Sequence, residues 1–280
     1  MGSFRVSVFS PVLVLAIVAC AGVSAWYITQ AYQSGTQEVE EVESTGLPEP
    51  LADILAAAAV YMRDNRMVAA RDLLVHAVQS FPDDPSRAEI RRLLGRVNVD
   101  LLFTDDAIEG KSIHRAEEPG GLAELAERLG TSTEYLLLAN GKSVLAVEGD
   151  EELQVYSMQF SVTVSPEEKE VVVERNGEFF ASYPLLGMKL PRGVSLPFPS
   201  EVRSKFELVG GRRVNPGDPD SGKGVRCIEM SHYGVVLRPP PGEGEDATGF
   251  FLEPGDLDEL SILLGKNGKV RFGNPVGADS

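Results

Sequence analysis

The sequence predicts an α+β chain with several parts: an N-terminal membrane-spanning helix, an α-helical hairpin unit, a small strand-helix-helix-strand module and a mainly β domain. Three observations support this prediction. Residues 6–32 carry no charge, residues 51–103 repeat apolar side chains at spacings of three and four, and the apolar period changes to two from Phe160 onward. A length of 280 residues is sufficient for one or two domains.

The uncharged N-terminal stretch is long enough to cross a bilayer as a helix, with an arginine before it and aromatic residues near its far end. Residues 1–32 are therefore expected to be a single-pass inner-membrane anchor, with the soluble part in the periplasm. Two alternatives stay open. The segment could be a cleaved signal, or the chain could be a lipoprotein, because residues 17–20 (IVAC) resemble a bacterial lipobox that would lipidate Cys20. All three place the protein at the cell envelope.

Composition limits the possible partners. The chain is 24% charged and 43% hydrophobic, which is ordinary for a globular protein, so most of it is expected to fold. A formal net charge of -16 argues against nucleic acid as a partner, because an acidic surface repels phosphate. Residues 33–50 are acidic and contain proline without apolar periodicity, which predicts a solvated linker.

Residues 51–104 are predicted to be helical. Two periodic segments precede Pro82, and Ser86 with Glu89 predicts a capping box for a third helix. The first two helices resemble one tetratricopeptide-type hairpin, with the spacing of that repeat at Ala56, Tyr61, Ala70, Leu73 and Ala77. A small helical packing unit is the preferred interpretation, because one repeat buries too little surface by itself; a peptide-binding groove is the alternative.

Residues 111–156 show the pattern strand, helix, helix, strand. The first helix is predicted from one apolar face, formed by Leu122, Leu125, Ala126 and Leu129. Thr131 and Glu134 predict a capping box for the second helix, and residues 152–156 have strand character.

In order, length and turn positions this segment resembles a LysM module, with "PGGL", "LAERLG", "LLLANG" and "VEGDEELQVY" in register with the family's pattern. LysM modules bind the N-acetylglucosamine glycan of peptidoglycan or chitin in a shallow groove between two loops. The resemblance implies a glycan site lined by Glu118, Pro119, Gly120, Gly121, Leu122, Asn140, Gly141, Lys142 and Ser143. The usual Asp or Thr before the first helix is a glycine here. The alternative is that Gly121 and Asn140 serve only turns and caps.

Residues 159–273 are predicted to form a mainly β domain, followed by a tail at 274–280. Short alternating segments in a glycine- and proline-rich stretch predict strands, and Asn176-Gly177 predicts a two-residue hairpin turn. A single helix is expected to begin at an Asp256 cap and to end at Gly265.

The hairpin followed by "YPLLGMKLPRG" resembles the opening of an L,D-transpeptidase catalytic domain. This family crosslinks peptidoglycan stem peptides through the cysteine of a Ser-His-Gly-Cys-x-Arg motif, and it includes chains that also carry LysM. Alignment on the closing segment, residues 250–272, puts Phe250 at the cysteine position, and Gly249 matches the glycine. The serine, histidine and arginine positions are occupied by Ala247, Thr248 and Leu252. The resemblance therefore implies an inactive domain, a pseudoenzyme.

Cys227 and His232 are the remaining catalytic candidates. Cys227 lies in an apolar strand pattern, a straight strand would turn His232 to the opposite face, and burial would suppress the thiolate. A buried structural cysteine and a surface histidine are the preferred interpretation. The alternatives are a divergent L,D-transpeptidase or hydrolase that uses this pair, and intermolecular or redox pairing of the thiol, because an intrachain disulfide partner is missing from the soluble part.

No cofactor and no metal site are expected. The three histidines lack ligand spacing, and the acidic clusters at 243–246 and 256–259 suit solvated loops and helix caps better than a calcium site or a glycosidase pair. We therefore expect a membrane-anchored envelope protein that binds peptidoglycan or another N-acetylglucosamine glycan through residues 111–156. An envelope assembly adaptor with a protein partner is the remaining alternative.

Overall fold

The structure is a computed structural model that describes residues 49–273 except positions 217, 233 and 243. The predicted anchor at 1–32, with Cys20, and residues 33–48 of the predicted linker lie outside the described residues. Within the described part, no helix is both long and apolar enough to cross a membrane. The described residues from Asp53 onward belong to one compact unit.

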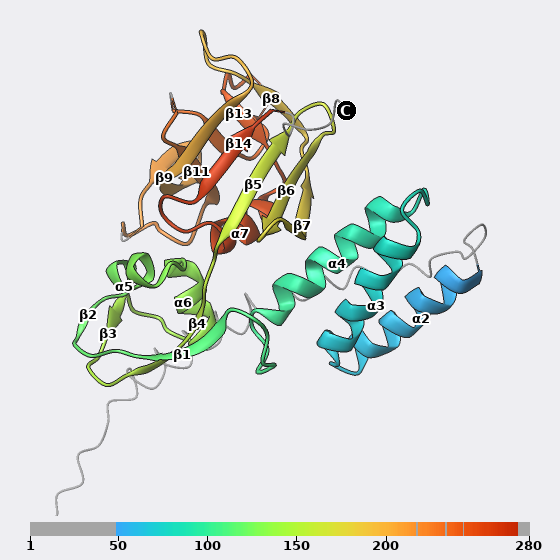
Figure 1. Cartoon of the computed structure of the whole chain (residues 1–280). Helices are drawn as coiled ribbons and strands as arrows, with labels where there is room; N and C mark the ends of the chain where they lie inside the picture. Colours follow the sequence, from blue (N-terminus) through green and yellow to red (C-terminus); the bar gives the residue numbers. More distant parts are fainter. Residues whose placement is uncertain (1–48, 217, 233, 243, 274–280) are drawn as a thin grey trace, which may run out of the picture. The chain divides into compact units, whose positions relative to one another are not determined.

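The helical region begins two residues earlier than predicted. Helix α2 spans Glu49–Arg63, α3 spans Met67–Ser80 and α4 spans Arg87–Leu101 (Figure 1). Helices α3 and α4 pack against each other through the buried residues Ala70, Leu74, Ala77, Ile90, Leu94 and Val97. The predicted Ser86 capping box is wrong, because Ser86 has helical backbone angles and its hydroxyl bonds to Asp84 instead of to the helix.

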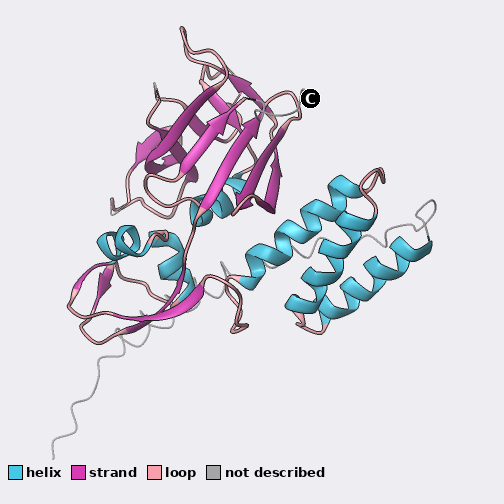
Figure 2. Cartoon of the chain, in the orientation of Figure 1, coloured by secondary structure: helices cyan, strands magenta, loops and turns pink. Residues whose placement is uncertain are grey.

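Residues 111–156 contain the predicted strand, helix, helix and strand (Figure 2). Strand β1 (Lys111–Arg115) pairs antiparallel with β4 (Glu152–Tyr156), and helices α5 (Leu122–Leu129) and α6 (Thr133–Ala139) lie between them in the chain. The predicted cap at Thr131 is wrong by one residue. Ser132 caps α6, and its hydroxyl accepts a hydrogen bond from the Tyr135 N–H at 3.0 Å.

The C-terminal domain is built on one large sheet, which has ten strands among the described residues. The strand order is β7-β6-β5-β14-β9-β11-β12-β13-β8, and β10 pairs with β9. The strands are β5 (Phe160–Ser165), β6 (Glu170–Arg175), β7 (Glu178–Pro184), β8 (Gly187–Lys189), β9 (Phe198–Val209), β10 (Arg212–Val214), β11 (Val225–Met230), β12 (Val236–Arg238), β13 (Gly249–Phe251) and β14 (Lys269–Phe272).

The hairpin turn between β6 and β7 is confirmed. Asn176 and Gly177 have φ angles of 54° and 80°, the left-handed values that a two-residue turn of this type requires. Helix α7 (Pro254–Leu263) packs against β11, but its predicted Asp256 cap is wrong. Glu253 occupies the cap position and Pro254 is the first residue of the helix. Proline suits this position because a backbone N–H there would have no partner within the helix.

A row of aromatic rings connects the parts of this unit. Ring centroids lie 5.7 Å apart for Phe103 and Tyr135, 6.3 Å for Tyr135 and Tyr156, 6.2 Å for Tyr156 and Phe160, and 4.6 Å for Phe160 and Phe180. The buried apolar residues of 111–156 and of the sheet form one hydrophobic cluster. The segments predicted as separate domains therefore share a core.

Two polar contacts add to this shared packing. The Asn98 amide of α4 donates to the Phe180 carbonyl of β7 at 2.8 Å, which satisfies an acceptor on the end strand of the sheet. Gly95 allows the close approach, because a Cβ there would lie 3.0 Å from the Ala181 Cα. The second contact joins α6 to β9, where the half-buried Lys205 ammonium donates to Glu134 at 2.6 Å.

Helix α7 carries two carboxyl groups whose protonation is coupled to folding. Burial, reinforced by the negative charges of Asp256 and Asp100, raises the pKa of Glu259 to about 7. Burial and the charge of Glu253 raise the pKa of Asp256 to about 6. Because the folded chain holds these protons more tightly than the unfolded chain, their stabilising contribution is present at acidic pH and is lost as the pH rises through 6 and 7.

The free energy of unfolding is therefore expected to fall between about pH 4 and pH 7, from the ordinary pKa values of these carboxyls to their raised ones, and Glu259→Gln should remove much of that slope. The variant should match the parent chain near pH 4 and exceed it by about 2–3 kcal/mol at pH 8, since one pKa unit corresponds to about 1.4 kcal/mol. Urea unfolding across this range is the measurement, with the exposed Glu201→Gln as the matched control. A slope that survives in Glu259→Gln would contradict this assignment.

Candidate functional site

The two loops predicted to bind glycan lie side by side. The short strands β2 (Gly120–Gly121) and β3 (Ala146–Val147) pair antiparallel, so that Gly120 faces Val147 and Gly121 faces Ala146. The N–H of the buried Leu122 donates to the Leu145 carbonyl at 3.1 Å. This ladder was not predicted, and it holds the two loops in a fixed register.

Two of the predicted glycan-binding side chains point to internal partners. The Asn140 amide donates to the carbonyls of Leu136 and Gln154 at 2.9 and 3.0 Å and accepts from the Gln154 N–H at 2.6 Å. Lys142 forms an ion pair with Glu151, and that hydrogen bond lowers the pKa of the Glu151 carboxyl. Asn140 and Lys142 therefore fix the loop after α6 onto the adjoining strand.

The exposed surface of these loops is partly apolar. Glu118, Pro119, Gly120, Gly141 and Ser143 are exposed, as the prediction requires. Beside them Val144 is 59% exposed and Leu145 is 51% exposed. Sequence reasoning missed these two side chains, although an apolar "VLAV" run in a loop between a helix and a strand was the available signal.

The position aligned with the transpeptidase cysteine lies inside the hydrophobic core. Phe250 is fully buried on β13, and its ring packs against Phe272 at 4.6 Å between centroids. Leu252, aligned with the arginine, is also fully buried. Gly249 has a φ of 146°, and a Cβ there would lie 2.4 Å from the Val236 carbonyl, so backbone packing alone requires this glycine.

Cys227 and His232 lie in different environments. Cys227 is fully buried on β11, and this burial raises the pKa of its thiol to about 12. His232 follows in the turn after β11, where its ring stacks on Phe198 at 4.2 Å between ring centroids and its backbone N–H donates to the Ser200 hydroxyl. The expected surface histidine is in fact half-buried.

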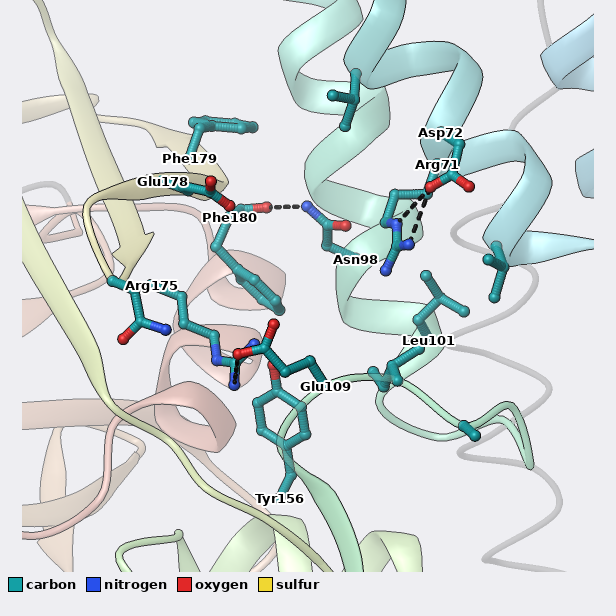
Figure 3. Close-up of a pocket in the computed structure, with 15 residues that line it drawn as sticks. Arg71, Asp72, Asn98, Leu101, Glu109, Tyr156, Arg175, Glu178, Phe179 and Phe180 are labelled. Carbon is teal, nitrogen blue, oxygen red and sulfur yellow. Dashed lines mark hydrogen bonds and ion pairs between the residues drawn. The ribbon is translucent and has the colours of Figure 1, made fainter.

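A cavity of about 440 Å³ lies elsewhere and contains none of the predicted site residues (Figure 3). It is formed by α3, α4, the loop before β1, the end of β4 and the β6–β7 hairpin. Its polar and aromatic lining includes Arg71, Asn98, Tyr156, Arg175 and Phe180. No sequence motif marked this cavity, because its walls come from five separate segments. Among the described residues, no cluster of His, Cys, Asp or Glu side chains could hold a metal ion.

Comparison with known proteins gives matches only among solved structures. No protein-family model matches the chain, and no curated protein matches it. L,D-transpeptidase 1 of Mycobacterium tuberculosis is 12% identical with a TM-score of 0.29, and the match covers 41% of this chain and 59% of that chain. An L,D-transpeptidase from Mycobacterium smegmatis is 13% identical with a TM-score of 0.30, with coverages of 46% and 65%.

An L,D-transpeptidase from Stackebrandtia nassauensis is 15% identical with a TM-score of 0.30, and the match covers 56% of this chain and 78% of that chain. The chain thus spans less than two thirds of the two mycobacterial structures. These likenesses assign neither a reaction nor a ligand to the chain.

Proposed function

We propose that this protein binds an N-acetylglucosamine glycan of the cell wall through residues 111–156, and that its large β domain does not catalyse transpeptidation. In this proposal residues 1–32 tether the chain at the envelope. The observation that carries the binding half is the pair of loops joined by β2 and β3, which displays Val144 and Leu145 to solvent beside Pro119 and the glycines.

The chemistry of these loops suits a sugar with an acetamido group. An exposed apolar side chain gains free energy when it covers the acetyl methyl or an apolar sugar face. The exposed loop backbone around Gly141 and Ser143 can exchange hydrogen bonds with hydroxyl and amide groups. The internal bonds of Asn140 and Lys142 hold this loop in place, which reduces the entropy lost on binding.

The non-catalytic half of the proposal is supported by Phe250 and Cys227. The aligned nucleophile position holds an apolar ring in the core, and the only cysteine in the described part of the chain is buried. Acyl transfer through cysteine needs an accessible thiolate beside a base and an oxyanion site. Neither position offers an accessible thiolate.

The glycan proposal predicts that Val144→Ser combined with Leu145→Ser weakens binding of the full-length chain to purified peptidoglycan sacculi. Losing apolar contact from two side chains should cost about 1.5 kcal/mol, or roughly tenfold in affinity. Cosedimentation of the detergent-solubilised chain with sacculi is the measurement.

Ile113→Ser is the matched control, because Ile113 is the most exposed large apolar residue of the same segment but lies on β1. It should bind as the parent chain does. The proposal is wrong if the parent chain does not cosediment, or if the control loses as much binding as the loop variant.

A further inference from the structure

The cavity between α3, α4 and the β6–β7 hairpin contains two arginines that are more buried than their counter-charges (Figure 3). The side chains of Arg71 and Arg175 are 33% and 20% exposed, whereas those of their partners Asp72 and Glu109 are 64% and 82% exposed. Carboxylates this exposed compensate little of a buried charge. The inner part of the cavity is therefore more positive than its rim.

Arg175 in particular has unused hydrogen-bonding capacity. Its contact with Glu109 is long, at 3.4 Å, and its Nε is buried with no hydrogen-bond partner among the described residues. A buried guanidinium N–H without an acceptor is unfavourable, so an acceptor that entered the cavity would be stabilised. Among the described residues, the guanidinium group of Arg71 donates hydrogen bonds only to Asp72, its neighbour in the chain.

The Tyr156 side chain lines the same cavity as the two arginines. Burial raises the pKa of Tyr156, the charges of Arg175 and Arg71 oppose that rise, and the charge of Glu109 adds to it. Both guanidinium groups therefore act on the same hydroxyl. The Arg175 guanidinium also lies over the Tyr156 ring, 5.3 Å from its centroid.

The rest of the wall limits what this group can carry. Leu101, Ile108 and Phe180 supply apolar surface on the cavity side. Asp72, Glu109 and Glu178 also line it, so carboxylates outnumber guanidinium groups in the lining as a whole. A ligand with more than one negative charge would therefore be repelled more strongly than a monoanion. The planar fork of a guanidinium matches a carboxylate in geometry.

We propose that this cavity binds a small organic monoanion, with a carboxylate held between Arg71 and Arg175 and an apolar substituent against Leu101 and Phe180. The volume of about 440 Å³ is within the range of small-molecule sites. The proposal is independent of glycan binding, because none of the residues predicted to bind glycan lines this cavity.

The test is calorimetric titration of the full-length chain with 3-phenylpropionate and with its neutral counterpart 3-phenylpropanamide. The carboxylate should bind at least tenfold more tightly than the amide, since hydrogen bonds to a charged group are about twice as strong as neutral ones. Arg175→Gln should lower the affinity for 3-phenylpropionate at least tenfold and leave the affinity for the amide unchanged. Arg128→Gln, an exposed change on α5, should alter neither affinity.

Arg71→Gln is the second variant and should lower the affinity for 3-phenylpropionate in the same way. With two variants, the test does not depend on whether Arg175→Gln folds. Equal affinity for carboxylate and amide, no binding of either, or unchanged affinity in both arginine variants would overturn the proposal. Tighter binding of phenyl phosphate than of 3-phenylpropionate would overturn the preference for a monoanion.

Discussion

Cys227 in the folded chain is expected to react with iodoacetamide at pH 7 about a thousandfold more slowly than an accessible cysteine of ordinary pKa. Burial raises the pKa of this thiol from its ordinary value of 9.0 to about 12. Each unit reduces the reactive thiolate tenfold, so three units give roughly a thousandfold before any steric protection is added.

Peptide-resolved mass spectrometry is the appropriate measurement, because it follows Cys227 separately from Cys20, the other cysteine of the chain. Unfolding in urea should restore ordinary reactivity and serves as the internal control. Rapid alkylation of Cys227 in the folded chain would support instead the divergent transpeptidase or hydrolase that uses Cys227 and His232.

The burial of Cys227 could be predicted from sequence because it depends on a local pattern. Apolar residues around Cys227 indicate an inward-facing strand position, and a strand alternates its faces regardless of distant contacts. The Asn176-Gly177 turn was predictable for the same reason. In both cases a short run of neighbouring residues determines the outcome.

The cap of helix α6 was mispredicted because it depends on a distant residue. Thr131 and Ser132 are both plausible caps from sequence alone. Ser132 is the cap in the structure, and its hydroxyl also donates to the Ile262 carbonyl of α7 at 2.5 Å, a contact across 130 positions. Glu134, predicted to complete the capping box, instead pairs with Lys205.

The candidate sites also differ in whether local sequence or distant contacts determine them. The two glycine-bearing loops could be located from turn residues, but their β2–β3 register and the internal bonds of Asn140 could not. The arginine cavity had no sequence signal, because Arg71 and Arg175 are more than a hundred positions apart. Only the packing of α3 and α4 near the β6–β7 hairpin places these two guanidinium groups on one cavity.

Phe250→Ala is expected to destabilise the sheet domain by about 3–5 kcal/mol, because it removes a fully buried ring and leaves a cavity beside Phe272. Met188→Ala is the matched control. Met188 sits directly opposite Phe250 in the β13–β8 pairing but is exposed, so its loss should cost much less. Urea unfolding measures the free energy of unfolding of both variants, and native-state hydrogen exchange of the β13 and β14 amides measures the local effect.

Phe250→Cys extends this test to function, because it places a thiol at the position that resembles the transpeptidase nucleophile. The new thiol is expected to be as unreactive as Cys227, since position 250 is fully buried and the fully buried Leu237 lies opposite it on β12. Rapid alkylation of this cysteine in a folded variant would contradict the burial of position 250. Slow alkylation would agree with the proposal that this domain does not catalyse transpeptidation, because cysteine-dependent acyl transfer needs an accessible thiolate.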